Sequence, residues 1–280
     1  MKQIKTLFLL ITIFFYPLAV VNAEVCTSPK KFFIKNDFSD WNQPENQDRI
    51  SDTVWITRAD QRGIFNIAAE SAFSLTTSPF NTAWAFGSAA DFQNLTFANW
   101  QTWHGGPSGG PPSTVGRDAV IHLIDQDIYL DIKFLSWSAG PQGGGGGGGG
   151  FSYERSVCSP IAIDVKVNNS DGPITISQAE ALSVTVALNP DVQTGVNADW
   201  WVVATTPFGV FHYDLSSGTW LPGLVATFQG PLFNQPSIEV LNMTGLPAAN
   251  YTFYFGFDTN MNGSLEMNDI LFDSADVTIN

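Results

Sequence analysis

The stretch Ile128-Tyr-Leu-Asp-Ile-Lys-Phe134 carries an apolar residue at every second position, with a polar or amphipathic residue between each two. Successive side chains of a β-strand point to opposite faces, so this alternation predicts a strand with one buried and one solvated face. A second β-prone run, Ala119–Ile124, precedes it, and only Asp125-Gln-Asp127 separates the two. The sequence therefore predicts that both runs belong to one antiparallel sheet.

The composition of the chain agrees with a β-rich fold. Of its 280 residues, 44% are hydrophobic, 13% are aromatic and only 14% are charged, and there are 25 Gly and 16 Pro. The aromatic content excludes a disordered acidic tail, and the low charge excludes a coiled coil. The formal net charge of −14 excludes nucleic acid as the expected partner, because phosphates repel an acidic surface.

Further strands on both sides of this stretch predict an all-β protein with two antiparallel β-sandwich domains. In residues 24–160, the runs Thr53–Thr57, Gly63–Ile67 and Asn94–Phe97 lie between turn residues, and we expect a jelly-roll-like sandwich. In residues 161–280, seven short strands joined by Gly, Pro and Asn turns predict an Ig-like sandwich. These seven are Ile161–Val167, Leu182–Leu188, Trp200–Thr205, Gly209–Tyr213, Leu224–Phe228, Ile238–Leu241 and Tyr251–Phe257.

The distribution of charge marks the boundary between the two domains. Residues 161–280 hold twelve acidic residues and a single basic residue, Lys166, whereas residues 24–160 are much closer to balance. Such an asymmetry favours two units over one, and Ser159-Pro160 is suited to form a short hinge between them.

Residues 1–23 have the features of a secretory signal peptide. Two lysines form a basic start, Leu7–Tyr16 forms an apolar core, and Val21-Asn22-Ala23 forms a small-residue cleavage site. The alternative, a transmembrane anchor, needs about 20 apolar residues, and Pro17 interrupts this run. We therefore expect a secreted protein, extracellular or periplasmic, with no membrane span.

The chain has two cysteines, Cys26 and Cys158, and both follow the predicted signal peptide. An even pair in an oxidising compartment indicates one disulfide, which here would join the first strand of the first domain to its last. The alternative is a pair of buried free thiols.

An unbroken run of eight glycines, Gly143–Gly150, lies between two predicted strands, Phe134–Trp137 and Phe151–Arg155. The run lacks the Gly-Lys-Ser/Thr ending of a phosphate loop, and ordering eight glycines costs much conformational entropy. We therefore expect a loose hairpin tip and no binding site.

Five stretches of the first domain are distinctive: Asn46–Arg58, Ser78–Gly87, Val115–Ile124, Asp127–Trp137 and Gly150–Arg155. They resemble a module of secreted bacterial proteins, many of which are surface proteins with C-terminal sorting signals. The resemblance covers most of residues 40–155. It implies export and a β-rich fold, and it carries over no catalytic residues.

The stretch Asp258-Thr-Asn-Met-Asn-Gly-Ser-Leu-Glu-Met-Asn-Asp269 has the spacing of a twelve-residue EF-hand calcium loop. Gly263 falls at the position of the sharp turn, and the terminal Asp resembles the loops of dockerins. A strand, Tyr251–Phe257, precedes the loop in place of the usual helix. The alternative is an acidic Asn-Gly hairpin turn. The predicted calcium ligands, which offer oxygen atoms at regular spacing, are Asp258, Asn260, Asn262, Ser264, Glu266 and Asp269.

The sequence shows no recognisable catalytic constellation, since it has neither a Gly-x-Ser-x-Gly nor a His-Glu-x-x-His motif. We expect a calcium-stabilised, non-enzymatic adhesion module that binds a cell-surface or matrix component, and its oligomeric state stays open. A glycan-binding module with exposed aromatic platforms is the second hypothesis. A hydrolase whose site the sequence does not reveal is the third. The candidate platforms are Trp100, Trp103, Trp200 and Trp201.

Overall fold

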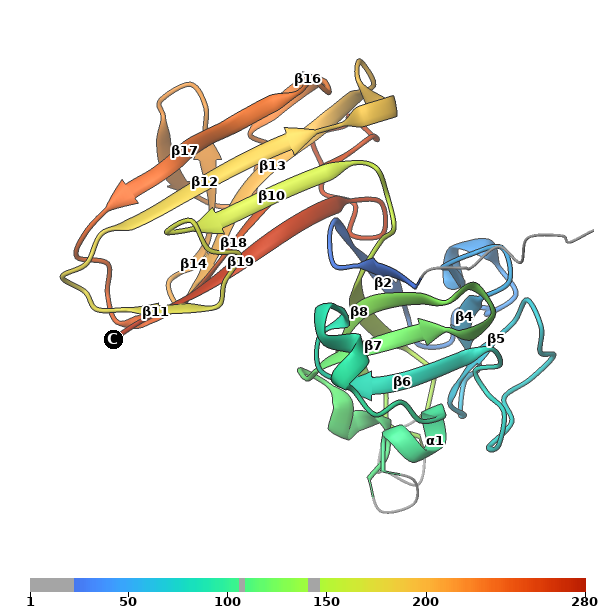
Figure 1. The fold of residues 1–280 in the computed structure, drawn as a ribbon. Helices are drawn as coiled ribbons and strands as arrows, with labels where there is room; N and C mark the ends of the chain where they lie inside the picture. The colour runs from blue at the N-terminus through green and yellow to red at the C-terminus, as the bar shows by residue number, and fades with distance from the viewer. Residues whose placement is uncertain (1–22, 106–108, 141–146) are drawn as a thin grey trace, which may run out of the picture.

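The computed structural model describes residues 23–105, 109–140 and 147–280, and nearly all regular structure in these ranges is β-strand (Figure 1). The helices are short, as in α1 (Trp100–Trp103). Of the helices in the described ranges, none is long and apolar enough to cross a membrane. The prediction of an all-β protein is confirmed. The predicted signal peptide, apart from Ala23, lies outside the described residues.

The first unit is a sandwich of a large and a small sheet. Its strands are β1 (Glu24–Cys26), β2 (Lys30–Lys35), β3 (Asp48–Arg49), β4 (Trp55–Arg58), β5 (Ile64–Asn66), β6 (Thr82–Phe86), β7 (Asp118–Leu123), β8 (Ile128–Trp137) and β9 (Phe151–Ser156). The large sheet has the order β2-β9-β8-β7-β6, and β1 pairs in parallel with β8. The small sheet has the order β3-β4-β5.

The core of the first unit lies between these two sheets. Ile132 and Phe134 of β8 point into it, together with Ile56 of β4 and Ile64 of β5. The burial of β8 alternates along the strand, with Asp131 on the outer face. The alternation predicted for this strand is therefore confirmed.

One predicted strand of the first unit, Asn94–Phe97, is wrong. The preceding residues form 3-10 turns, η2 (Ala89–Asn94), and the chain then makes a single bridge between Ala98 and Trp84. Ser88 caps these turns, because its side chain accepts a hydrogen bond from the backbone N–H of Ala90. The polar cap favours the turn over an extended strand.

The second unit is also a sandwich of two sheets. Its strands are β10 (Ala162–Val167), β11 (Ile174–Ile176), β12 (Leu182–Asn189), β13 (Asn197–Thr206), β14 (Gly209–Asp214), β15 (Thr219–Pro222), β16 (Phe228–Pro231), β17 (Gln235–Met243), β18 (Ala249–Asp258) and β19 (Leu271–Ile279). One sheet has the order β10-β12-β17, and the other contains β15-β14-β13-β18-β19. A separate hydrophobic core lies between them.

Six of the seven strands predicted here coincide with strands of the structure, and the seventh, Leu224–Phe228, is wrong because β16 only begins at Phe228. The prediction also missed β11, β15 and β19. The longest of these, β19, contains Asp273 beside residues of the core. The partial burial of Asp273 is tolerated because the backbone N–H of Val165 donates to its Oδ2 at 3.0 Å.

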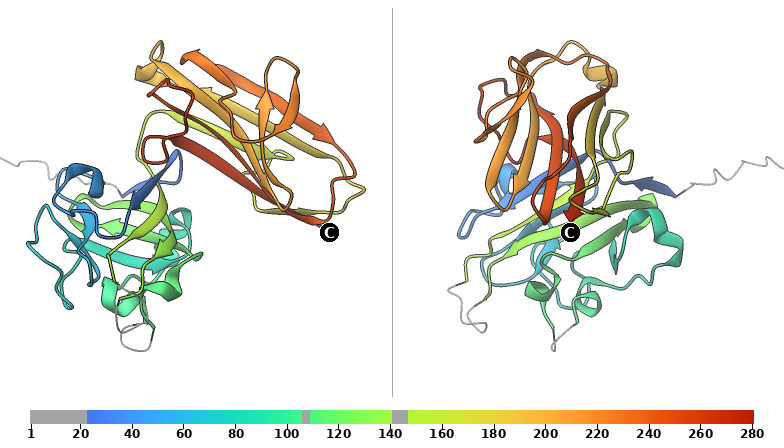
Figure 2. Two further views of the ribbon diagram at one scale, coloured as in Figure 1. Left: turned by 180° about the vertical axis from the view of Figure 1, so that it is seen from behind. Right: turned by 90° about the vertical axis from the view of Figure 1, so that its left-hand side faces the viewer.

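The two units share one continuous sheet, which the sequence did not indicate. β19 of the second unit pairs with β2 of the first through Phe272 and Lys30. The rings of Phe32 and Phe272 stack across this junction with centroids 4.4 Å apart. Figures 1 and 2 show the two units side by side, with β2 and β19 between them.

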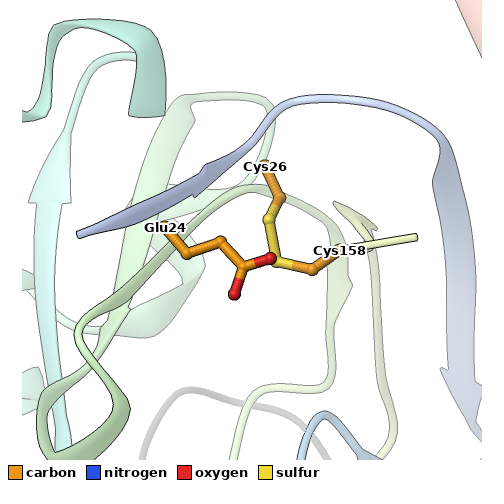
Figure 3. A group of neighbouring side chains, drawn as sticks. All are labelled: Glu24, Cys26 and Cys158. Carbon is orange, nitrogen blue, oxygen red and sulfur yellow. A yellow bond between two sulfur atoms is a disulfide. The ribbon is translucent and has the colours of Figure 1, made fainter. Parts of the chain in front are cut away.

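The predicted disulfide is confirmed. Cys26, in β1, is bonded to Cys158, two residues after the end of β9 (Figure 3). The bond therefore joins the first strand of the first unit to the segment that follows its last. The carboxylate of Glu24 lies beside the two sulfur atoms.

The end of the glycine run is packed, contrary to the expected loose tip. Gly147–Gly150 are buried, and the residues before Gly147 lie outside the described ranges. The N–H of Gly148 donates to the carbonyl of Asp60 at 2.7 Å, and the N–H of Gly150 donates to Asp37 Oδ1 at 2.7 Å. Arg58 donates to the carbonyl of Gly150 at 2.9 Å. These bonds to the chain before β5 offset the entropy cost of ordering the glycines.

Candidate functional site

The predicted calcium loop joins two neighbouring strands of the second unit. β18 ends at Asp258 and β19 begins at Leu271, so the loop lies at one end of the shared sheet (Figure 1). Gly263 has a φ of 76°, a region that suits glycine, and it provides the sharp turn that the spacing predicted.

Asp258 lies directly opposite Asp199 in the ladder between β18 and β13, and both residues are fully buried. Directly opposed residues of an antiparallel pair project from the same face, with Cβ atoms about 4.5–5.5 Å apart. The fold therefore brings two carboxylates together inside the protein.

Both carboxylates accept hydrogen bonds from neutral donors. Asp258 accepts from the indole N–H of Trp201 at 2.8 Å and from the backbone N–H of Asn260 at 3.2 Å. Asp199 Oδ1 accepts from the side-chain amide of Gln229 at 2.7 Å. Such bonds lower the cost of burying a carboxylate, but they leave its charge uncompensated.

The backbone of the loop also turns toward Asp199. The N–H groups of Asn262 and Gly263 donate to Asp199 Oδ2 at 3.0 and 2.6 Å. Asp199 therefore belongs to the loop site, although it lies on another strand and was not among the predicted ligands.

Glu266 supplies a third carboxylate near this pair. Its Oε1 accepts from the side-chain amide of Asn262 at 2.7 Å, and its Oε2 is buried with no hydrogen-bond partner among the described residues. Burial raises the pKa of Asp258, the hydrogen bond from Trp201 opposes this, and the charges of Asp199 and Glu266 raise it further. The three carboxylates thus lie close enough for their charges to interact.

Within the described residues, no basic side chain is paired with any of these three carboxylates. The single basic residue of the second unit, Lys166, lies elsewhere, with Nζ 2.8 Å from Asp164 and 2.7 Å from Asp171. Buried charges in proteins are normally paired or coordinate a metal. A hard cation with oxygen ligands fits this donor set.

The other predicted ligands lie outside the group formed by Asp199, Asp258 and Glu266. Asn260, Ser264 and Asp269 are exposed, and Ser264 takes part through its N–H, which donates to Asn262 Oδ1 at 2.7 Å. Burial lowers the pKa of Lys31 in β2, and the charge of Asp269 opposes that shift. Asp269 therefore lies near the first unit.

In the part of the chain that the structure describes, one group of three acidic, His or Cys ligand atoms lies within 4.8 Å of one another. It consists of Glu24, Cys26 and Cys158, and the disulfide removes both thiols as ligands (Figure 3). The carboxylates of the loop are spaced more widely than this. An acidic hairpin turn thus stays the alternative to a calcium site.

The four candidate stacking platforms are not exposed, which corrects the expectation. Trp100, Trp103, Trp200 and Trp201 are 1%, 8%, 5% and 2% exposed. Trp100 and Trp103 pack against Trp84 in the first core. Trp200 and Trp201 are adjacent in β13 and so point to opposite faces, and both faces of this strand are covered by hydrophobic clusters.

Asp199 is the residue that sequence reasoning missed at this site. The sequence feature that could have identified it is an acidic residue that directly precedes a run of apolar residues, Trp200–Ala204, in the same strand. Its position opposite Asp258 depends on the register between β13 and β18, which neither strand specifies alone.

Comparison with known proteins adds no relative to this description. No protein-family model matches the chain, and no curated protein matches it in sequence.

Proposed function

We propose that this chain is a secreted, calcium-stabilised, non-enzymatic module for adhesion to a cell-surface or matrix component. The observation that carries the calcium part is the pair Asp199 and Asp258, which are fully buried, directly opposed and without a basic partner among the described residues. A divalent cation would offset their repulsion.

The residues that would hold calcium are Asp199, Asp258 and Glu266, with oxygen atoms of the exposed loop completing the set. Calcium would supply positive charge in the loop that connects β18 to β19. Because β19 also pairs with β2, a firm loop would hold the second unit against the first. The function of the ion in this proposal is structural.

Secretion is supported by the signal-like start of the chain and by the Cys26–Cys158 disulfide. Structural disulfides persist mainly in oxidising compartments outside the cytosol.

A binding function is supported by apolar side chains exposed on the second unit. Phe208 is 65% exposed, Leu215 56%, Val225 52% and Phe233 44%. Single exposed apolar residues are ordinary, but two of these side chains, Leu215 and Phe233, line the same apolar groove, and apolar grooves are typical of interaction surfaces.

Calcium titration by calorimetry tests the proposal. We expect a single site with Kd of roughly 10⁻⁴–10⁻³ M, as in extracellular calcium modules. Asp258→Asn and Asp199→Asn should each abolish the binding heat. Asp191→Asn, which removes an exposed carboxylate from the same unit, should leave it unchanged. Equal binding by wild type and Asp258→Asn would refute the site.

The adhesion part needs its own assay. Purified protein is passed over immobilised matrix proteins and over whole cells, with calcium or with chelator. We expect retention that falls when calcium is removed. No retention on any surface in calcium would contradict adhesion while leaving the calcium site standing.

A further inference from the structure

A cleft lined by both charged and apolar side chains lies where the two units meet. It has a volume of about 630 Å³, within the range of small-molecule sites, which often lie between domains. One wall is the outer face of the first sheet, formed by β2, β9, β8 and β7. The other wall is formed by β18 and β19 of the second unit.

On the first wall, charged residues that face the cleft alternate along the strands with apolar residues that face the core. Lys30, Asp131, Lys133 and Glu154 line the cleft from β2, β8 and β9. Lys133 Nζ lies 2.9 Å from Asp118 of β7, and Lys30 Nζ lies 3.9 Å from Glu154. The wall thus presents ammonium donors beside carboxylate acceptors.

The second wall carries hydroxyl groups and one aromatic ring. Thr252 and Tyr254 come from β18, and Ser274 and Asp276 come from β19. Thr252 donates to Asp276 at 2.6 Å, and Lys30 reaches from the first wall to donate to Ser274 at 3.3 Å. Lys30 therefore links the two walls.

Glu154 is a largely buried acceptor in this cleft. Its side chain is 19% exposed, and its carboxylate has no hydrogen bond among the described residues. Burial raises the pKa of Glu154, the charges of Lys30 and Lys133 oppose the shift, and Asp276 and Asp118 add to it. A desolvated acceptor of this kind gains from a hydrogen-bond donor on a ligand.

The lining decides the chemistry of the ligand. The carboxylates outnumber the lysines, which disfavours phosphate, sulfate and other anions. Lys30 and Lys133 already pair with Glu154 and Asp118, which offsets much of the negative charge that would attract a free cation. Apolar side chains such as Ile132 and Leu135 alternate with charged ones along the lining, which suits the mixed surface of a sugar better than a lipid chain. Hydroxyl groups both donate and accept, so a neutral polyhydroxyl compound can satisfy ammonium and carboxylate groups that lie side by side.

We propose that this cleft binds a neutral oligosaccharide, with Glu154 and Lys133 as the principal hydrogen-bonding residues and Tyr254 as an apolar wall. The proposal is independent of the calcium loop. It places glycan recognition at the junction of the two units, away from the four buried tryptophans.

Binding is tested with the full-length mature protein on an array of immobilised neutral, sialylated and sulfated oligosaccharides, followed by calorimetry with the best neutral one. We expect binding to neutral oligosaccharides only. Glu154→Ala and Lys133→Met should each weaken it by about tenfold or more, the loss expected for one charge-assisted hydrogen bond.

Glu45→Ala is the matched control, because Glu45 is an exposed glutamate outside the cleft, and it should bind as wild type. Melting temperatures identify a cleft variant that fails to fold. If one of the two cleft variants does not fold, the affinity of the other tests the proposal. Absence of binding to every neutral oligosaccharide, stronger binding to sulfated ones, or unchanged affinity in both cleft variants would overturn the proposal. The calorimetry is repeated in chelator, which separates this outcome from the calcium result.

Discussion

Asp48 and Arg155 form a buried ion pair in the first unit. Arg155 Nε lies 2.6 Å from Asp48 Oδ2, and Arg155 Nη2 lies 2.8 Å from Oδ1, a bidentate geometry. The hydroxyl of Tyr153 also donates to Asp48, at 2.7 Å. All three residues are buried, and Arg155 depends on Asp48 for compensation of its charge, whereas Asp48 also has Lys31 Nζ at 3.9 Å.

Removal of one partner of this pair should be costly. We expect Asp48→Ala to lower the free energy of unfolding by about 3–5 kcal/mol, because it leaves the Arg155 charge buried and unpaired. Asp171→Ala, which removes half of an exposed pair with Lys166, should cost about 1 kcal/mol or less. Urea unfolding of both variants measures the difference. Equal costs would contradict the account.

The same pair predicts a pH dependence. Burial alone would raise the pKa of Asp48, but the charge and hydrogen bonds of Arg155 outweigh it and hold the pKa below its ordinary value. The folded state then binds this proton less readily than the unfolded state. Stability from Asp48 is therefore present above about pH 3.9 and is lost as pH falls through the folded pKa.

Urea unfolding between pH 7 and pH 3 tests this sign. The gap in stability between wild type and Asp48→Asn should narrow as the pH falls below about 3.9. A gap that widens under acid would show that the pKa of Asp48 is raised in the folded state.

At the scale of elements, the packed end of the glycine run gives a matched comparison. Gly149 and Gly116 both have positive φ, 69° and 80°. A Cβ on Gly149 would lie 2.8 Å from the carbonyl carbon of Ala59 and 2.9 Å from Asp60 Cα, whereas a Cβ on Gly116 would meet nothing within 4 Å.

We therefore expect Gly116→Ala to cost about 1–2 kcal/mol, from backbone strain alone. Gly149→Ala should cost a further 1–3 kcal/mol or so, because the backbone of the chain before β5 must move. Chemical denaturation of both variants measures the two costs. A Gly149→Ala variant as stable as Gly116→Ala would mean that this segment is not packed in solution.

The Cys26–Cys158 disulfide should contribute to the stability of the first unit. Replacing both Cys26 and Cys158 by serine should lower the free energy of unfolding by about 2–5 kcal/mol. Intact mass after alkylation should show no modified cysteine in native wild-type protein and two after reduction. Two alkylated cysteines without reduction would contradict the bond.

Local patterns predicted the elements whose two faces differ in polarity. β8 alternates cleanly, and its burial follows the alternation. β19 was not predicted because Asp273 and Ser274 interrupt its buried residues. The hydrogen-bond donor to Asp273 comes from β10, which is far away in the sequence. The exposure expected for the tryptophans was wrong because the partners that bury them are distant in sequence. Trp100 and Trp103 of α1 pack against Trp84, and both faces of β13, which holds Trp200 and Trp201, are covered by hydrophobic clusters.

At the scale of the whole molecule, the sequence located one half of the candidate site. The spacing of the loop identified Asp258, Asn262 and Glu266, which the structure brings near one another. Asp199 and the β2–β19 pairing could not be predicted, because both depend on the register between strands distant in sequence. The cleft was missed for the same reason, since its walls belong to different units.

We infer above all that a cation stabilises the loop where the second unit meets the first. Thermal unfolding in about 10 mM calcium, compared with chelator, tests it most directly. With Kd of roughly 10⁻⁴–10⁻³ M this is a ten- to hundredfold excess, so calcium should stabilise the protein by about 1.4–2.7 kcal/mol and raise Tm by several degrees. Asp258→Ala should abolish that rise, and Asp191→Ala should retain it. Identical melting curves of the wild type in calcium and in chelator would contradict the claim and leave the loop as an acidic turn.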